Sequence, residues 1–79
     1  SHEPPLGMMI EKQENDMWLQ RKLLELPSTQ YQVLHLRQVE KKSMEEIAGI
    51  IGITPASAAT ILSRARQRML TEIRRRMGS

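Results

Sequence analysis

The sequence predicts an all-α fold, a single small domain of four helices. No stretch of its 79 residues alternates strictly between apolar and polar residues, as a half-buried strand would. Apolar residues recur instead at helical spacing in four segments, which proline, glycine or short polar links separate. A chain of this length buries too little surface on folding to support two independent cores. We therefore expect one all-α domain over residues 10–77.

The first helix is expected at residues 10–26, which contain no glycine or proline. Its apolar residues fall on two sides of the helix, so it needs packing partners. They are Leu19, Leu23 and Leu26 on one side and Ile10, Met17 and Leu24 on another. Pro27 then ends this helix, and Ser28 is placed to cap a second one that runs to about Glu40.

Both ends of the chain are expected to lie outside the domain. Pro4, Pro5 and Gly7 disfavour a stable helix, so we interpret residues 1–9 as a flexible linker or a tag remnant. Residues 78–79 are interpreted as a short tail.

The last two helices carry clear signals for their starts. Ser43 and Glu46 have the spacing of a capping box, in which each side chain accepts the other residue's backbone N–H. Thr54 is placed to cap the last helix, with Pro55 in its first position, where a missing N–H costs nothing. From there nothing interrupts the helix until Met77.

The segments 43–51 and 54–63 have the spacing of a helix-turn-helix, a motif that can place its second helix in the DNA major groove. Ala48 allows the two helices to cross closely, and Gly52, four residues later, suits the left-handed position after a helix. The same spacing arises at corners of helical bundles, so both DNA binding and simple packing remain open.

The last helix has an apolar side and a polar side when projected at about 100° per residue. The apolar side is Ala58, Leu62, Ala65, Met69 and Ile73, and the polar side is Ser57, Thr60, Arg64, Arg68, Thr71 and Arg75, with Ile61 at the border. Short hydroxyl side chains near the start would let the helix approach base edges, while arginines would reach phosphates or guanine. A solvated face is the alternative.

Positive charge is concentrated in the same segment. Residues 60–79 hold six arginines and one acid, whereas the first 59 residues hold six cations and eight acids. We therefore expect the C-terminal segment, rather than the whole surface, to meet a polyanion. Cations at a helix C-terminus also stabilise the helix dipole, which is the competing explanation.

Several runs of residues carry a family resemblance over residues 23–77. They are Leu26-Pro27, Val33-Leu34-His35-Leu36-Arg37, Ser43-Met44-Glu45-Glu46-Ile47-Ala48, Gly52-Ile53-Thr54 and Ser63-Arg64-Ala65-Arg66. Together they resemble the fourth conserved region of bacterial RNA polymerase sigma factors, in particular the extracytoplasmic-function (ECF) group. The Arg-Ala-Arg ending separates this pattern from response-regulator output domains, which share its other features.

The resemblance implies a sigma-factor domain that directs transcription initiation. Such a domain recognises the −35 promoter element in double-stranded DNA with its last helix, and it docks through apolar surface on the flap of the β subunit of the RNA polymerase core. An anti-sigma protein is a further candidate partner for the exposed apolar faces of the first two helices. Residues 1–9 would then be the end of an interdomain linker.

The recognition helix departs from the family pattern at two positions. Ala59 and Ile61 stand where the family usually carries cations, so both would face DNA or its border without the usual chemistry. This predicts either weaker binding or a promoter in which contact with thymine methyl groups replaces hydrogen bonds. The resemblance assigns base reading to Thr60 and a base or phosphate contact to Arg64.

Further phosphate contacts are expected outside the last helix. Arg37, Lys41 and Lys42 are candidates, together with the N–H groups after Ser43, because a helix N-terminus attracts anions. An exposed loop is the equal alternative for the two lysines.

Several functions find no support in the sequence. There is no cysteine, no Gly-rich phosphate loop and no nucleophile motif, and His35 has no spaced ligand partners, so we expect no enzyme, cofactor or metal site. Only two aromatic residues argue against a base-stacking platform. No apolar run is long enough to span a membrane, so a cytoplasmic protein without a membrane partner is expected.

Two other functions remain open. A free-standing helix-turn-helix regulator would need to dimerise to place two recognition helices about one DNA turn apart, whereas the sigma-factor domain is expected to be monomeric. A protein-interaction domain that has lost DNA binding would keep the fold and also explain Ala59 and Ile61.

Overall fold

The computed structural model describes the backbone of residues 6–78 and the side chains of residues 14–78. Its four helices are α1 (Leu6–Leu24), α2 (Ser28–Gln38), α3 (Met44–Ile51) and α4 (Pro55–Gly78). No described residue lies in a strand, which confirms the all-α prediction. The interpretation of residues 1–9 as a linker concerns mostly residues outside the described range.

Helix α1 begins at Leu6 rather than at residue 10, so Gly7 lies inside it. The first N–H groups of any helix lack a partner within the helix, so prolines shortly before a helix start cost no hydrogen bond. The helix ends at Leu24, two residues earlier than expected. Leu26 precedes Pro27, and a residue before proline is disfavoured in the helical region.

The predicted Ser28 cap of α2 is wrong. Pro27 is the N-cap residue, with no side-chain cap, and Ser28 is already helical. Pro27 has extended backbone angles (φ −51°, ψ 143°), and its carbonyl accepts the Tyr31 N–H at 2.9 Å. Because this bond is the first of the helix, Ser28 lies inside α2 and its hydroxyl is not in the N-cap position. The helix ends at Gln38, two residues before the expected Glu40.

The predicted starts of α3 and α4 are confirmed. Ser43 and Glu46 form the reciprocal capping box, with N···O distances of 3.2 and 3.1 Å. The Thr54 hydroxyl accepts the Ser57 N–H at 3.1 Å, and Pro55 is the first residue of α4. Helix α4 extends to Gly78, one residue beyond the expected end.

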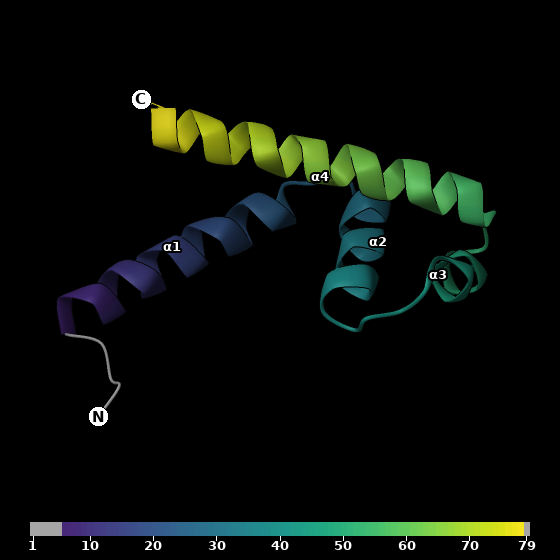
Figure 1. The fold of residues 1–79 in the computed structure, drawn as a ribbon, viewed down its shortest axis with the longest axis horizontal. Coiled ribbons are helices and arrows are strands. Elements are labelled where there is room, and N and C mark those ends of the chain that lie inside the picture. The colour runs from purple at the N-terminus through teal and green to yellow at the C-terminus, as the bar shows by residue number, and fades with distance from the viewer. Residues whose placement is uncertain (1–5, 79) are drawn as a thin grey trace.

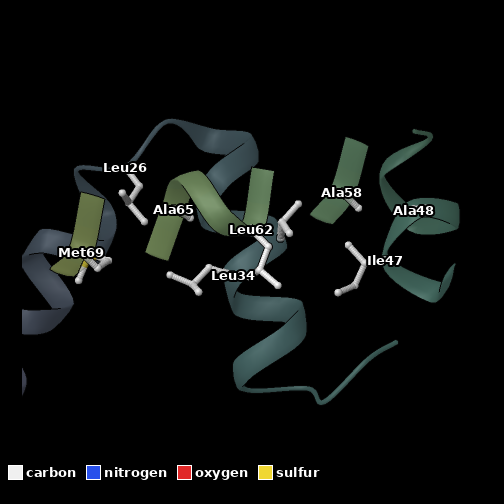
Figure 2. Close-up of a cluster of buried hydrophobic side chains, with 9 residues drawn as sticks. Leu26, Leu34, Ile47, Ala48, Ala58, Leu62, Ala65 and Met69 are labelled. Atoms are coloured by element: carbon white, nitrogen blue, oxygen red, sulfur yellow. The ribbon is translucent and has the colours of Figure 1, made fainter. Parts of the chain in front are cut away.

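The core runs along one side of α4 (Figure 2). Ala58, Leu62, Ala65 and Met69 are its buried residues on α4, and Leu26, Val33, Leu34, Ile47 and Ala48 complete it. The side chains of Ala58 and Ala65 are fully buried, and their small size lets the α4 backbone lie close to its neighbours. Ile73, expected on the same side, is only half-buried. Stability therefore rests on the packing of α4 against α2 and α3.

Helix α4 spans the whole molecule (Figure 1). Helices α2 and α3 lie along its N-terminal half, and α1 runs beside its C-terminal half. The overall extents are 45 × 33 × 15 Å, so the fold is flat and open rather than spherical. Because all three other helices lie on one side of α4 in this view, its opposite side is left uncovered.

Candidate nucleic-acid interface

Helices α3 and α4 meet at 98°, within the range of a helix-turn-helix. The turn between them is set by Gly52, whose φ of 86° is left-handed, as its position after the helix predicts. The Ala48 carbonyl accepts the N–H groups of Gly52 and Ile53 at 2.8 and 3.0 Å. Ala48 itself is only 3% exposed, as expected for a residue at the crossing of the two helices.

The predicted polar side of α4 faces outward. Five of its predicted site residues, Ser57, Ala59, Thr60, Arg64 and Arg68, are exposed. Ile61 is half-buried and packs against the core, as expected for a border position. Within the described residues, the N-terminal half of this side is uncovered and available to a partner, whereas Arg68, Thr71 and Arg75 line a hollow together with Lys22, Glu25 and Leu26.

The hydroxyl groups at the start of α4 are partly engaged. Thr54 Oγ1 donates to Ser57 Oγ at 2.9 Å, which leaves the Ser57 proton available to an outside acceptor. Thr60 Oγ1 donates to the Ala56 carbonyl of its own helix at 3.1 Å. The hydroxyl proton of Thr60 is therefore used within α4, and its oxygen lone pairs and methyl group remain for a ligand.

Two shallow hollows flank the start of α4. The Thr60 hollow, about 390 Å³, is lined by Ala56, Ser57, Thr60, Ile61 and Arg64. The Arg66 hollow, about 440 Å³, lies on the other flank and is lined by Arg37, Met44, Ala59, Leu62, Ser63, Arg66, Gln67 and Leu70. Each hollow thus has at least one arginine at its edge. The helical projection favours one flank of α4, so Arg66 on the other flank is not among the predicted site residues. Its place in the Arg-Ala-Arg run is the sequence signal that indicates it.

Arg37 helps to hold the loop that carries the two predicted lysines. Its Nη1 donates to the Lys42 carbonyl at 2.9 Å, and the Lys42 N–H donates to the Leu36 carbonyl at 3.0 Å. These bonds hold Lys41 in the left-handed region (φ 58°), a conformation unfavourable for a residue with a Cβ. Lys41 is exposed and Lys42 half-buried. The structure brings Arg37 to the Arg66 hollow but does not bring either lysine into it.

The start of α3 is less open to anions than expected. The Ser43 N–H donates to the Glu46 carboxylate, and this backbone hydrogen bond is the largest cause of a lowered pKa of Glu46. The Ser43 hydroxyl and the charge of Lys42 lower this pKa further, while desolvation opposes them. The Glu46 N–H is also occupied by Ser43 Oγ. The capping box thus keeps a negative charge at this helix end, which weakens it as a phosphate site.

The C-terminal arginines contact the protein itself. Arg76 donates to Asn15 of α1 at 3.2 Å, and Arg75 pairs with Glu72 at 3.2 Å. Lys22 of α1 lies 3.7 Å from the same Glu72 carboxylate. This end of the predicted arginine segment therefore joins α4 to α1.

An apolar groove lies between α2 and α3. It has a volume of about 410 Å³ and is lined by Tyr31, Gln32, His35, Leu36, Ile50 and Ile51. The His35 ring stacks on Tyr31 at 5.8 Å between ring centres, and its Nε2 lies 3.6 Å from Glu40. Ile50 is 58% exposed. None of these residues belongs to α4, so the groove and the outward side of α4 are separate surfaces.

The comparison with known families shows which family this fold belongs to. The family model described as Sigma-70, region 4 matches residues 16–69. The chain belongs to the sigma-70 region 4 family. No curated protein and no solved structure matches it.

Membership of the sigma-70 region 4 family gives the general role of the helix-turn-helix. Region 4 is a DNA-binding regulatory domain of transcription initiation, not an enzyme family, and in general it recognises the −35 promoter element and docks on RNA polymerase. No single helix within residues 6–78 is long and apolar enough to cross a membrane; α3 and α4 pass that criterion only jointly, across their 98° bend.

Proposed function

We propose that this region 4 domain recognises a −35 promoter element with α4 while bound to the RNA polymerase core, and that it belongs to a sigma factor of the ECF group. The observation that carries the proposal is the uncovered outward side of α4, set at 98° to α3 and flanked by arginines. A helix held in this way can enter the DNA major groove without a rearrangement of the core.

The arginines suit the two phosphate strands that border the groove. Arg64 lies beside Thr60 on one flank of α4, with Arg68 one turn further along at the hollow next to α1, and Arg66 lies with Arg37 on the other flank. Contacts to phosphates fix the position of a protein on DNA, and contacts to base edges provide specificity. In this arrangement the DNA sugar-phosphate backbone is contacted by side chains from α4 and from the region between α2 and α3. They are Ser57, Arg68, Arg37, Lys41 and Lys42. Thr60 reads a base, and Arg64 contacts a base or a phosphate.

The groove between α2 and α3 is the proposed docking site for the β flap. Its walls include Leu36, Ile50 and Ile51, which offer apolar surface to a partner helix. Because the groove lies apart from the outward side of α4, the domain can hold polymerase and DNA at once. Met17 and Leu24 on α1, 65% and 70% exposed, are candidate contacts for an anti-sigma protein.

Titration with duplex DNA over a range of salt concentrations tests the proposal. Neutralisation of phosphates gives a negative slope of log affinity against log salt, about −0.9 for each phosphate contacted. A slope near zero would favour the second candidate function, a protein-interaction domain, for which the uncharged Ala59 and Ile61 are the specific support. A stable homodimer by mass measurement, bound to a two-fold site, would instead favour a free-standing regulator.

A further inference from the structure

We propose that the first two turns of α4 select A·T base pairs by contact with the C5-methyl group of thymine. The inference rests on the proposed function, in which α4 lies in the major groove. It specifies the chemistry of the base pairs that Ala59, Thr60 and Ile61 face.

Three of the side chains beside Thr60 at the start of α4 are aliphatic, and Ser57 and Ser63 supply the neighbouring hydroxyl groups. Ala56, Ala59 and Ile61 present only aliphatic carbon, and Thr60 carries the one hydroxyl among the four. Among the four bases, thymine alone places a methyl group in the major groove, and aliphatic side chains are its usual contacts.

The hydrogen bond of Thr60 is compatible with this preference. Its hydroxyl proton is donated to the Ala56 carbonyl at 3.1 Å, so the oxygen can only accept a further hydrogen bond. Adenine offers an N6 amino donor in the major groove, and its partner thymine offers the methyl group. Cytosine also offers an amino donor, at N4, so the hydrogen bond alone does not separate A·T from G·C, and the methyl group decides between them. An A·T pair is therefore the pair that suits both the methyl group and the lone pairs of Thr60.

The flanking arginines place this aliphatic surface over the bases. The Thr60 hollow ends at Arg64, and the hollow on the opposite flank joins Ala59 to Arg66. Arg64 and Arg66 are two positions apart, so about 160° separates them across the outward side of α4, and that arc holds Ala56, Ala59, Ser63 and Thr60. When each arginine contacts a different phosphate strand, the residues between them face the groove floor.

Duplexes in which deoxyuridine replaces thymine test the inference with the 79-residue chain. Duplexes are first selected for binding from a random-sequence pool and then resynthesised with deoxyuridine at each thymine in turn, which removes only the methyl group. We expect an affinity loss of about fourfold for each methyl group contacted by α4. At a contacted position, the substitution of thymine by 5-methylcytosine should lose less affinity than its substitution by unmethylated cytosine.

Two variants of Thr60 separate its methyl group from its hydroxyl. Thr60→Ser keeps the hydroxyl and should abolish the preference for thymine over deoxyuridine at one position. Thr60→Val keeps a methyl group and should retain that preference. The side chain is exposed, and equal thermal unfolding of both variants and the original chain verifies that the fold is intact.

The possible failures are distinguishable. Three outcomes would overturn the methyl contact alone. The first is salt-dependent DNA binding that is insensitive to deoxyuridine, and the second is a set of selected duplexes without thymine at the α4 contact. The third is a preference for thymine over deoxyuridine that is lost in Thr60→Val but kept in Thr60→Ser. The absence of salt-dependent binding to any duplex would overturn the proposed function together with this inference.

Discussion

The guanidinium carbon of Arg76 on α4 lies 4.5 Å from the ring centre of Trp18 on α1. Arg76 also donates to Asn15, and Lys22 of α1 reaches Glu72 of α4. The apolar side chains of Met17 and Leu19, before the last turn of α1, are exposed. Polar and cation–π contacts therefore provide much of the attachment of this part of α1 to α4. This part of α1 is therefore joined to α4 by contacts that water and salt can weaken.

We predict that Trp18→Ala loosens α1 without unfolding the helix-turn-helix. Loss of the cation–π contact should cost about 0.5 to 2 kcal/mol, and the buried core does not include this part of α1. Hydrogen exchange should therefore accelerate in α1 and stay unchanged in α3. Met17→Ala, at a 65% exposed position, is the control and should have little effect. Equal acceleration in α1 and α3 would mean that the two helices unfold together.

Gly52→Ala should destabilise the domain, whereas Gly49→Ala should stabilise it. A Cβ at either position meets nothing within 4 Å, so only the backbone distinguishes them. Gly52 has a φ of 86°, where alanine costs about 1 to 2 kcal/mol. Gly49 is inside α3, where alanine is favoured by about 0.5 to 1 kcal/mol. Urea unfolding of both variants measures the difference, and a shift of the same sign in both would contradict the role of Gly52.

The capping box should make stability depend on pH through Glu46. Hydrogen bonds from Ser43 lower the pKa of Glu46 in the folded state below its ordinary value of 4.5. The unfolded chain therefore binds more protons than the folded chain between these two pKa values. The contribution of the carboxylate is complete above the unfolded pKa and is lost as pH falls through the folded pKa.

Comparison with Glu46→Gln isolates this contribution, because glutamine keeps a capping hydrogen bond but does not titrate. Unfolding followed at decreasing pH should show the two proteins converging in stability below pH 4.5. A constant difference across the whole acidic range would mean that the Glu46 charge is not what the cap stabilises.

Arg64→Ala and Lys42→Ala should weaken DNA binding in different ways. If Arg64 reads a base, its loss should cost about 1 to 3 kcal/mol on the preferred duplex and relax sequence preference. Lys42→Ala should weaken all duplexes alike and reduce the salt slope by about 1. Binding of each variant to a selected duplex and to a random duplex provides the measurement. Equal losses on both duplexes for Arg64→Ala would exclude base reading.

Ala48→Glu should unfold the domain, because it places an unpaired charge where α3 crosses α4. The side chain of Ala48 is 3% exposed, and an uncompensated buried charge costs about 3 kcal/mol or more. Ile50→Glu on the same helix is the matched control, because Ile50 is 58% exposed. It should leave cooperative melting intact and weaken binding to the polymerase core. Retained melting in Ala48→Glu would contradict the crossing of the two helices.

Local signals predicted those parts of the fold that neighbouring residues determine. The box of Ser43 and Glu46, the left-handed Gly52 and the start of α4 at Pro55 each depend on residues within a few positions. The outward side of α4 was also predictable, because burial follows the helical period. The roles of its residues in DNA binding remain predictions.

Long-range contacts and competing local preferences were not predictable. Asn15 and Arg76 are 61 positions apart, and no pattern in either segment indicates that they meet. Ser28 failed as a cap because the fixed backbone of Pro27 already supplied the start of α2. Arg66 shares a hollow with Arg37 of α2, and no pattern in either segment indicates that these two residues come together.

Residues that stabilise the domain and residues that face outward alternate along α4. Leu62, Ala65 and Met69 are buried, whereas Thr60, Arg64 and Arg68 are exposed. Substitutions at the exposed positions change no core contact, so such changes carry little penalty in folding. Under the proposed function, a lineage carrying this domain acquires a new promoter repertoire through point mutations at these exposed positions, without compensating changes elsewhere in the chain.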